Sequence, residues 1–316
     1  MDTSKEHVLV TGGLGYLGSV LCQHLLRAGY RITVVDNHRR ARQGFVRRRA
    51  GGSIRFVPGD VRDEGLMRCL LRKADAVIPL AAVVGAPACE RDPGLARSVN
   101  LEAIRLLNRL RSHSQLVIFP STESGYGAQP GGACCTEESI VNPVSLYGRL
   151  KVEAEADLLG SPNTVSLRLA TLFGPSPRMR WDLLVHGFVY SALRDGFLEL
   201  FEKDFKRNFV HVRDAADGFI HCVGNAKRMS GSPYNLGLKT ASLTKGELAV
   251  KIGRFVPKLS VRSTPIGKDQ DRRNYAVSSR RLREAGFEAS RSLDEGIGEL
   301  LASYQAREEC SLGKNR

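Results

Sequence analysis

The sequence lacks an apolar run long enough to cross a membrane. Hydrophobic residues make up 42% of its 316 residues, but no stretch approaches the roughly 20 consecutive apolar residues that a spanning helix needs. The first six residues are polar and mixed in charge, and an apolar strand pattern follows them directly, which does not match a secretory leader. We therefore expect a cytoplasmic protein without membrane contact.

Cysteine is scarce and irregularly placed. The seven cysteines include one adjacent pair, Cys134–Cys135, and no Cys-x-x-Cys spacing. The spacing favours neither a zinc site nor a redox-active pair, and reduced thiols are typical of a cytosolic protein. We expect no metal site.

Acidic residues are outnumbered, since 33 Asp and Glu stand against 47 Lys and Arg, for a net charge of +14. The densest basic run covers residues 39–49. Such a run can bind nucleic acid, but no nucleic-acid-binding module is recognisable around it. We interpret the run as a solvated basic surface and expect no nucleic-acid partner. Arginines further along the chain could instead serve an anionic substrate.

Tyr147 and Lys151 form an informative short motif. They stand four residues apart in the run 147–159, which contains no proline and is rich in Glu, Ala and Leu. On a helix this spacing places both side chains on one face. A lysine ammonium beside a phenol favours the phenolate and lowers its pKa from about 10, so that the tyrosine can exchange a proton with a sugar hydroxyl. Alternatively, the two residues are an ordinary half-buried tyrosine and a solvated lysine.

A glycine-rich turn lies near the N-terminus. It separates a strand pattern at residues 7–11 from a helical pattern at residues 19–28. The glycines follow a Gly-x-x-Gly-x-x-Gly spacing: Gly12, Gly15 and Gly18. Glycines in such a turn let the backbone approach a pyrophosphate at the helix N-terminus. The turn with its flanking elements predicts a dinucleotide-binding site.

Strand and helix patterns alternate along the first half of the chain. The strand patterns cover residues 7–11, 31–36, 54–61, 74–82, 115–122 and 163–171. The alternation predicts a parallel, doubly wound α/β sheet, in which ligands bind beyond the C-terminal strand ends. Five elements fall at such ends: Gly12, Asp36, Asp60, Ala81 and Thr122. Asp36 stands where an acid would bind the adenosine ribose and favour NAD over NADP.

Together these motifs resemble the extended short-chain dehydrogenase/reductase family, and more closely its nucleotide-sugar epimerases and dehydratases. The resemblance rests on Thr-Gly-Gly-x-Gly-Tyr-Leu-Gly, Gly-Asp-Val-Arg-Asp, Leu-Ala-Ala, Ser-Thr followed by Tyr126–Gly127, and Tyr147-Gly-Arg-Leu-Lys151. It implies a Rossmann sheet with a smaller C-terminal substrate-binding lobe, a bound NAD and a nucleotide-activated sugar substrate. We also expect a homodimer.

We expect the following division of the chain. Residues 1–174 form the dinucleotide-binding domain, to which the chain returns at 208–224. Residues 175–207 and 225–306 form the substrate-binding lobe. Residues 307–316 form a tail.

The resemblance also assigns roles by position. Thr122 hydrogen-bonds the sugar hydroxyl, Tyr147 is the proton-transferring base, and Lys151 binds the nicotinamide ribose and tunes Tyr147. The implied cofactor contacts are Gly12, Gly15, Tyr16, Leu17, Gly18, Asp36, Asn37, Asp60, Val61, Leu80, Ala81, Ala82, Asn100, Tyr147 and Lys151. The implied substrate contacts are Val84, Glu123, Thr171, Arg178, Arg180, Arg207 and Arg272.

The four arginines and Thr171 have more than one interpretation on the sequence. The planar fork of arginine suits diphosphate oxygens, although any one of these arginines could form a surface ion pair instead. Thr171 stands where family members commonly carry Asn, in Arg-x-x-Asn-x-x-Gly-Pro, so the sugar contact at this position is undetermined.

The reaction type depends on the residues after Thr122. A 4,6-dehydratase needs an acid and a base besides the tyrosine, and in dehydratases the essential glutamate follows the Ser/Thr in the second place. Here Glu123 takes the first place and Ser124 the second, and neighbours on an extended segment point to opposite sides. We therefore predict an NAD-dependent epimerase that works by transient oxidation to a keto-sugar. The alternatives are a dehydratase, a keto-sugar reductase, and a non-catalytic NAD(P)-binding regulatory protein.

Overall fold

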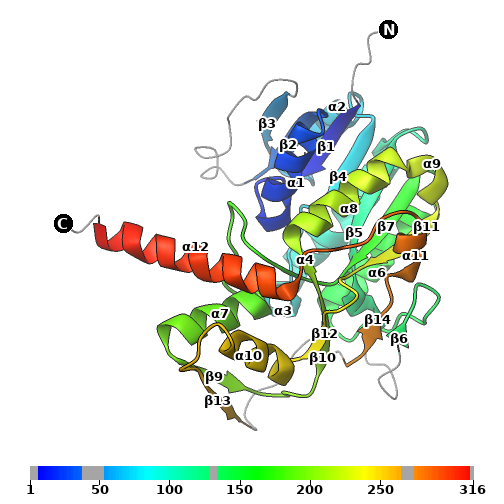
Figure 1. Cartoon of the computed structure of the whole chain (residues 1–316). Helices are drawn as coiled ribbons and strands as arrows, with labels where there is room; N and C mark the ends of the chain where they lie inside the picture. Colours follow the sequence, from blue (N-terminus) through cyan, green and yellow to red (C-terminus); the bar gives the residue numbers. More distant parts are fainter. Residues whose placement is uncertain (1–5, 38–52, 128–133, 265–273, 314–316) are drawn as a thin grey trace.

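The centre of the molecule is a seven-stranded parallel sheet with the order β11-β7-β5-β4-β1-β2-β3 (Figure 1). The computed structural model describes residues 6–37, 53–127, 134–264 and 274–313. The sheet strands are β1 His7–Thr11, β2 Arg31–Asp36, β3 Ile54–Pro58, β4 Ala76–Pro79, β5 Leu116–Thr122, β7 Thr164–Leu169 and β11 Ser232–Leu236. This parallel sheet confirms the predicted fold class.

The helices connect these strands and continue into the C-terminal part. They are α1 Tyr16–Arg27, α2 Glu64–Leu71, α3 Ala86–Arg91, α4 Pro93–Arg97, the π-helical turn η2 Ser98–Glu102, α5 Ala103–Leu110, the 3-10 turn η3 Glu123–Tyr126, α6 Leu146–Leu159, α7 Leu184–Arg194, α8 Val212–Gly224, α9 Ala226–Met229, α10 Lys245–Gly253, α11 Arg280–Glu284 and α12 Leu293–Gly313. Helices α1 and α8 lie side by side on one face of the sheet (Figure 1).

The strands are apolar on both faces because helices cover both faces. In β1, Val8 and Val10 pack into the core that includes α1 and α8, whereas Leu9 packs into the core that includes α2, α5 and α6. All seven residues of β5 are buried. The sheet therefore separates two hydrophobic cores and holds its C-terminal edge rigidly.

Three small sheets accompany the central one. They pair β8 Thr171–Phe173 and β12 Ser242–Thr244 with β10 Lys206–His211, β9 Phe197–Leu200 with β13 Ser260–Ser263, and β6 Cys134–Cys135 with β14 Ala276–Val277. Helices α7 and α10 gather with β9 and β13 at the lower end of Figure 1. In that view this group lies below the central sheet.

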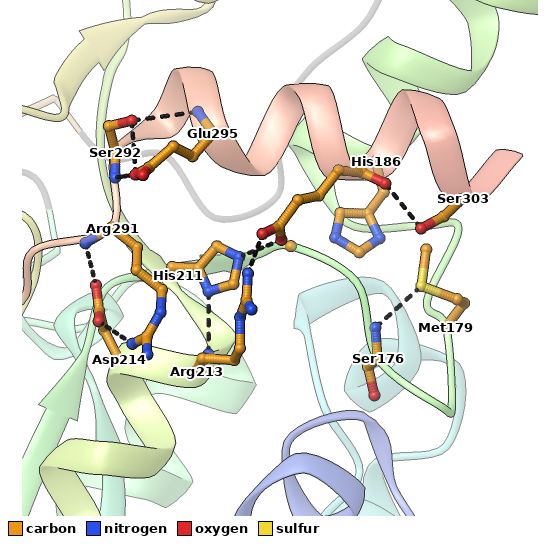
Figure 2. Close-up of polar contacts among 12 residues, drawn as sticks. Ser176, Met179, His186, His211, Arg213, Asp214, Arg291, Ser292, Glu295 and Ser303 are labelled. Atoms are coloured by element: carbon orange, nitrogen blue, oxygen red, sulfur yellow. Dashed lines mark hydrogen bonds and ion pairs between the residues drawn. The ribbon is translucent and has the colours of Figure 1, made fainter.

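Helix α12 is attached to α8 by charged contacts at its N-terminal side (Figure 2). The buried Asp214 carboxylate accepts the backbone N–H groups of Ser290 and Arg291, at 3.0 and 2.8 Å, and also pairs with the Arg291 guanidinium. About two turns into the helix, Glu299 accepts from His211 Nε2 at 3.1 Å and pairs with Arg213. These contacts join α12 to the end of β10 and the start of α8.

Three details of the predicted organisation differ from the structure. The pattern at 163–171 is divided at Ala170 into β7 and β8, and β8 leaves the central sheet to pair with β10. Strand β11 falls in the segment assigned to the substrate-binding lobe, but it pairs with β7 at the edge of the central sheet. The predicted tail, 307–316, is helical as far as Gly313. The remaining lobe boundaries stay predictions.

The turn between β1 and α1 has no room for side chains. Gly12 has φ +67°, and a Cβ on it would lie 2.7 Å from the Ala81 nitrogen. A Cβ on Gly18 would lie 2.4 Å from the Gly12 oxygen and 2.6 Å from the Gly13 Cα. The glycines therefore let the first turn of α1 fold back onto the end of β1.

We predict that Gly18→Ala lowers the free energy of unfolding by about 2 kcal/mol, because the methyl group meets backbone atoms that cannot rotate away. Gly224→Ala is the matched control, since a Cβ at this helical position has nothing within 4 Å. Urea unfolding should separate the two variants. Equal midpoints for Gly18→Ala and the wild type would contradict the steric argument.

Candidate active site

The predicted site residues at the strand ends share one edge of the sheet. The strand register aligns Thr11 of β1 with Val35 of β2 and with Pro79 of β4. Asp36 is the last residue of β2, and Thr122 is the last residue of β5. The residues that follow these positions begin the loops at this edge, so the structure brings the predicted cofactor and catalytic positions together.

Asp36 is tied to the glycine turn. Its Oδ2 accepts the backbone N–H of Leu14 at 3.0 Å. On the other side of the turn, Thr11 Oγ1 accepts the backbone N–H of Ala81 at 3.1 Å. Both flanks of the turn are therefore fixed, and the N-terminal residues Tyr16 and Leu17 of α1 begin directly behind it. This arrangement fits a dinucleotide pyrophosphate, because the turn is built on glycines that leave no room for a Cβ, and it leads into the N-terminus of α1.

Asn100 acts on the loop that follows β4. Its side-chain Oδ1 accepts the N–H of Val83 at 2.8 Å, and its Nδ2 donates to the Val83 carbonyl at 2.8 Å. Asn100 lies in the π-helical turn η2 and is 1% exposed. The structure thus shows Asn100 holding the segment that contains Leu80, Ala81 and Ala82. Val84, which follows Val83, is 40% exposed.

Asp60 follows β3 and is paired with its neighbour. Arg62 donates to the Asp60 carboxylate from its backbone and its guanidinium, at 2.9 and 2.6 Å. The same guanidinium donates to Ser98 at 3.2 Å. Because of these hydrogen bonds the pKa of Asp60 is lowered. The half-exposed Val61 and the exposed Asn37 lie beyond β3 and β2 on the same edge.

Thr122 ends β5 and caps the turn η3. Its hydroxyl accepts the backbone N–H of Ser124 and donates to the Ser124 hydroxyl, both at 3.1 Å. The side chain of Glu123 contacts another element, since its Oε1 accepts from Asn208 Nδ2 of β10 at 3.0 Å. Glu123 is 1% exposed, and its backbone carbonyl accepts the hydroxyl of Tyr275. Glu123 therefore joins the central sheet to the C-terminal part.

Helix α6 carries the Tyr-x-x-x-Lys pair. Ser145 caps the helix by accepting the N–H of Gly148 at 3.1 Å. Tyr147 is half-buried, whereas Lys151 is 3% exposed, with its Nζ 4.0 Å from the centre of the Phe119 ring of β5. Burial lowers the pKa of Lys151 to about 7, and the charge of Glu155 opposes that shift.

Sequence reasoning missed Glu155, which stands four residues after Lys151. It is 3% exposed and forms an ion pair with Arg168 of β7, with Nη2–Oε1 at 2.6 Å and Nε–Oε1 at 2.9 Å. The hydroxyl of Ser166 donates to its second oxygen at 2.7 Å. The signal was present, because Tyr147, Lys151 and Glu155 repeat at a spacing of four, which continues one helical stripe.

Arg180 lies near the candidate base. Its hydrogen bonds to Asp182 raise its pKa, and the phenol groups of Tyr147 and Tyr16 add smaller contributions. Tyr16 donates to the Gly174 carbonyl at 2.6 Å and lies 3.3 Å from Nε2 of the buried His186. The loop that carries Arg180 is thus anchored to the start of α1, behind the glycine turn.

The other predicted substrate residues occupy different environments. Arg178 is exposed, and its backbone N–H donates to the Ser176 hydroxyl at 3.2 Å. Arg207 is 4% exposed and donates to the Lys206 carbonyl at 3.2 Å. The Thr171 hydroxyl is buried and finds no hydrogen-bond partner within the described part of the chain. Arg272 lies outside the described residues.

The described residues contain neither a cluster suited to a metal ion nor a helix suited to cross a membrane. Across residues 6–37, 53–127, 134–264 and 274–313, no group of His, Cys, Asp and Glu is arranged to hold a metal ion. In the same ranges no helix combines the length and the apolar character that crossing a bilayer requires.

The parallel sheet, the glycine turn and the Tyr-x-x-x-Lys helix define an NAD-binding oxidoreductase-type fold. The family model described as the NAD dependent epimerase/dehydratase family matches residues 8–237. This chain therefore belongs to that family, which confirms both the predicted family and NAD as the cofactor.

Relatives and solved structures agree with this placement. The chain is 28% identical over 277 residues to UDP-arabinose 4-epimerase 1 of Arabidopsis thaliana, covering 77% of this chain and 66% of that protein, about two thirds of its length. It is 28% identical over 345 residues to UDP-glucose 4-epimerase of Bos taurus, covering 93% and 95%. The structure of MoeE5 in complex with UDP-glucose and NAD is similar, with a TM-score of 0.80, 25% identity, and coverage of 95% of this chain and 99% of that one.

We predict that Lys151→Met stabilises the cofactor-free protein at pH 6 and loses this advantage at high pH. Burial lowers the pKa of Lys151 from 10.5 to about 7, so between these pH values the unfolded chain binds more protons and wild-type stability rises with pH. The penalty for the buried charge is complete below pH 7 and reaches roughly 5 kcal/mol, at about 1.4 kcal/mol per pKa unit.

Urea unfolding at pH 6 and pH 9.5 measures this difference. Lys251→Met is the control, because Lys251 is a more exposed lysine that pairs with Asp294 at 2.7 Å and should gain no stability on replacement. A Lys151→Met advantage that is absent at pH 6, or that grows with pH, would contradict the burial argument.

Proposed function

We propose that the protein is a nucleotide-sugar epimerase that works by transient oxidation of a sugar hydroxyl to a ketone. The observation that carries the proposal is the buried lysine Lys151, one helical turn from Tyr147, beside the strand that ends at Thr122. A binding protein without chemistry has no need for a phenol tuned by this lysine, because such a phenol serves proton transfer. This argues against the non-catalytic alternative.

The catalytic residues act on one hydroxyl of the sugar. Thr122 and Tyr147 bind it, and Tyr147 takes its proton as the carbon is oxidised. The Lys151 ammonium stabilises the phenolate and so lets Tyr147 act near neutral pH. When NAD is bound, it supplies the reversible hydride acceptor. After the keto-sugar rotates, Tyr147 returns the proton to the oxygen on the inverted carbon.

Nucleotide sugars are the proposed substrates, in line with the UDP-sugar 4-epimerases that the chain resembles. Arg178, Arg180, Arg207 and Arg272 are the proposed contacts for the diphosphate, because guanidinium groups bind phosphate oxygens in pairs. The Thr171 hydroxyl is a proposed sugar contact, since it is buried and has no hydrogen-bond partner in the described residues. A cytoplasmic homodimer stays part of the proposal.

The surroundings of Glu123 favour an epimerase over a 4,6-dehydratase. A dehydratase needs a further acid and base at the sugar. The Glu123 carboxylate is instead bonded to Asn208 of β10, and Ser124, in the position of the essential glutamate, exchanges hydrogen bonds with Thr122. A keto-sugar reductase uses the same three catalytic residues and remains the third candidate.

We predict that Tyr147→Phe lowers turnover by about a hundredfold or more while folding and NAD binding persist, as is usual for the loss of a general base. Turnover is measured on a panel of UDP-sugars that includes UDP-glucose and UDP-arabinose. NAD binding, followed by calorimetry, is the control for an intact site. Wild-type turnover in the variant would show that Tyr147 is not the base.

We predict that turnover in deuterium oxide gives a product inverted at one carbon and unchanged in mass. The hydride stays within the enzyme during oxidation and reduction, so no solvent deuterium enters a carbon position. Mass spectrometry and proton NMR of the isolated sugar nucleotide measure both properties. A product lighter by one water and carrying deuterium at carbon would support the dehydratase, and a need for stoichiometric NADH would support the reductase.

A further inference from the structure

The stripe of α6 that carries the catalytic pair continues to a third ionisable residue. Tyr147, Lys151 and Glu155 are spaced by four, and Lys151 and Glu155 are each 3% exposed. A carboxylate with so little access to water is unfavourable unless it is paired. Its position, one helical turn from Lys151 on the same side of the helix, places a negative charge next to a lysine that also lacks solvent.

Glu155 is held so that its carboxylate cannot turn away. Arg168 contacts it with two nitrogens, at 2.6 and 2.9 Å, and Ser166 donates to the other oxygen at 2.7 Å. Arg168 is fixed in turn, because it donates to the Tyr126 hydroxyl at 3.0 Å and to the Glu137 carbonyl at 3.3 Å. The carboxylate beside Lys151 is therefore a permanent part of the structure.

Lys151 needs such a partner because its other surroundings favour the neutral amine. The face of Phe119 lies 4.0 Å from Nζ, and burial is the largest cause of the lowered pKa of Lys151. Among the ionisable groups of the described residues, the charge of Glu155 is the one that opposes this change. A neutral amine does not stabilise a phenolate by charge.

Other charged groups of the described residues lie near the catalytic pair. Glu90 accepts the backbone N–H of Leu146, the residue before Tyr147, at 3.3 Å. Arg180, from the loop before α7, interacts electrostatically with Tyr147 and forms an ion pair with Asp182. Arg168 lies beyond Glu155 on β7. Neither of these arginines can hold a proton on Lys151, because both are cations.

We propose that Glu155, fixed by Arg168 and Ser166, is a positioning residue that keeps the Lys151 ammonium charged and in place to stabilise the Tyr147 phenolate. The inference rests on the proposed function, since it concerns the residue that tunes the proposed base. It differs from a purely structural role for the Glu155–Arg168 pair, which would affect stability without affecting the titration of Tyr147.

The test is a spectroscopic titration of Tyr147 in the NAD-loaded protein. The near-ultraviolet absorbance of phenolate is followed against pH, and the curve of the matching Tyr147→Phe protein is subtracted to isolate this one tyrosine. Glu155→Gln keeps the size of the side chain and removes its charge. We expect the Tyr147 midpoint to move to higher pH by about one unit or more, the scale on which a close charge acts. Arg180 is present in both the wild type and the Glu155→Gln protein, so its effect on the Tyr147 midpoint cancels in the comparison.

Two further variants separate charge from stability. Glu155→Gln leaves Arg168 buried without its partner and can impair folding, so the double variant Glu155→Gln, Arg168→Gln replaces the ion pair by two amides and should show the same upward shift. Ser166→Ala removes a buried hydrogen bond but keeps the carboxylate, and we expect it to lower the unfolding temperature without moving the Tyr147 midpoint.

The outcomes distinguish this inference from the function on which it rests. If wild-type Tyr147 titrates no lower than an ordinary tyrosine, the assignment of Tyr147 as the tuned base fails. If wild-type Tyr147 titrates low and both Glu155 variants leave its midpoint unchanged, the role of Glu155 alone is refuted. An upward shift in the Glu155 variants that Ser166→Ala does not reproduce supports the proposal.

Discussion

The burial of an amine at the junction of α6 and β5 is the constraint on which the rest of the site depends. Lys151 lies against the ring of Phe119 with 3% of its surface exposed. A cation in such a place needs a fixed anion nearby, and Glu155 is supplied from the same helix and held by Arg168 from β7. The chemistry of α6 is thus coupled to the packing of two neighbouring strands.

The cofactor edge shows the same preference for fixed polar groups. Asn100 holds the backbone of Val83 with both atoms of its amide, and Asp36 accepts the backbone of Leu14 in the glycine turn. Because these loops are hydrogen-bonded within the described structure, a ligand does not have to order them when it binds. Such preorganisation reduces the entropy lost on binding and keeps the reacting groups aligned.

The C-terminal part joins the central sheet through buried polar contacts. Glu123 bonds Asn208 across the junction with β10, and Asp214 fixes the chain at Arg291 before α12. The position after Thr122 therefore carries an acid whose hydrogen bond serves assembly.

The sequence by itself determined the class of fold and the placement of Tyr147 and Lys151 on one helix, and it predicted which strand ends bind the cofactor. Strand and helix periods are local, and parallel strands must end at one edge, so the residues after each strand could be placed without coordinates. Only the tertiary structure decided that β11 completes the sheet, that Asn100 hydrogen-bonds the backbone of Val83, and that Glu155 forms an ion pair with Arg168. These features depend on pairing and burial between residues distant in the chain, and local patterns do not specify which distant partner is chosen.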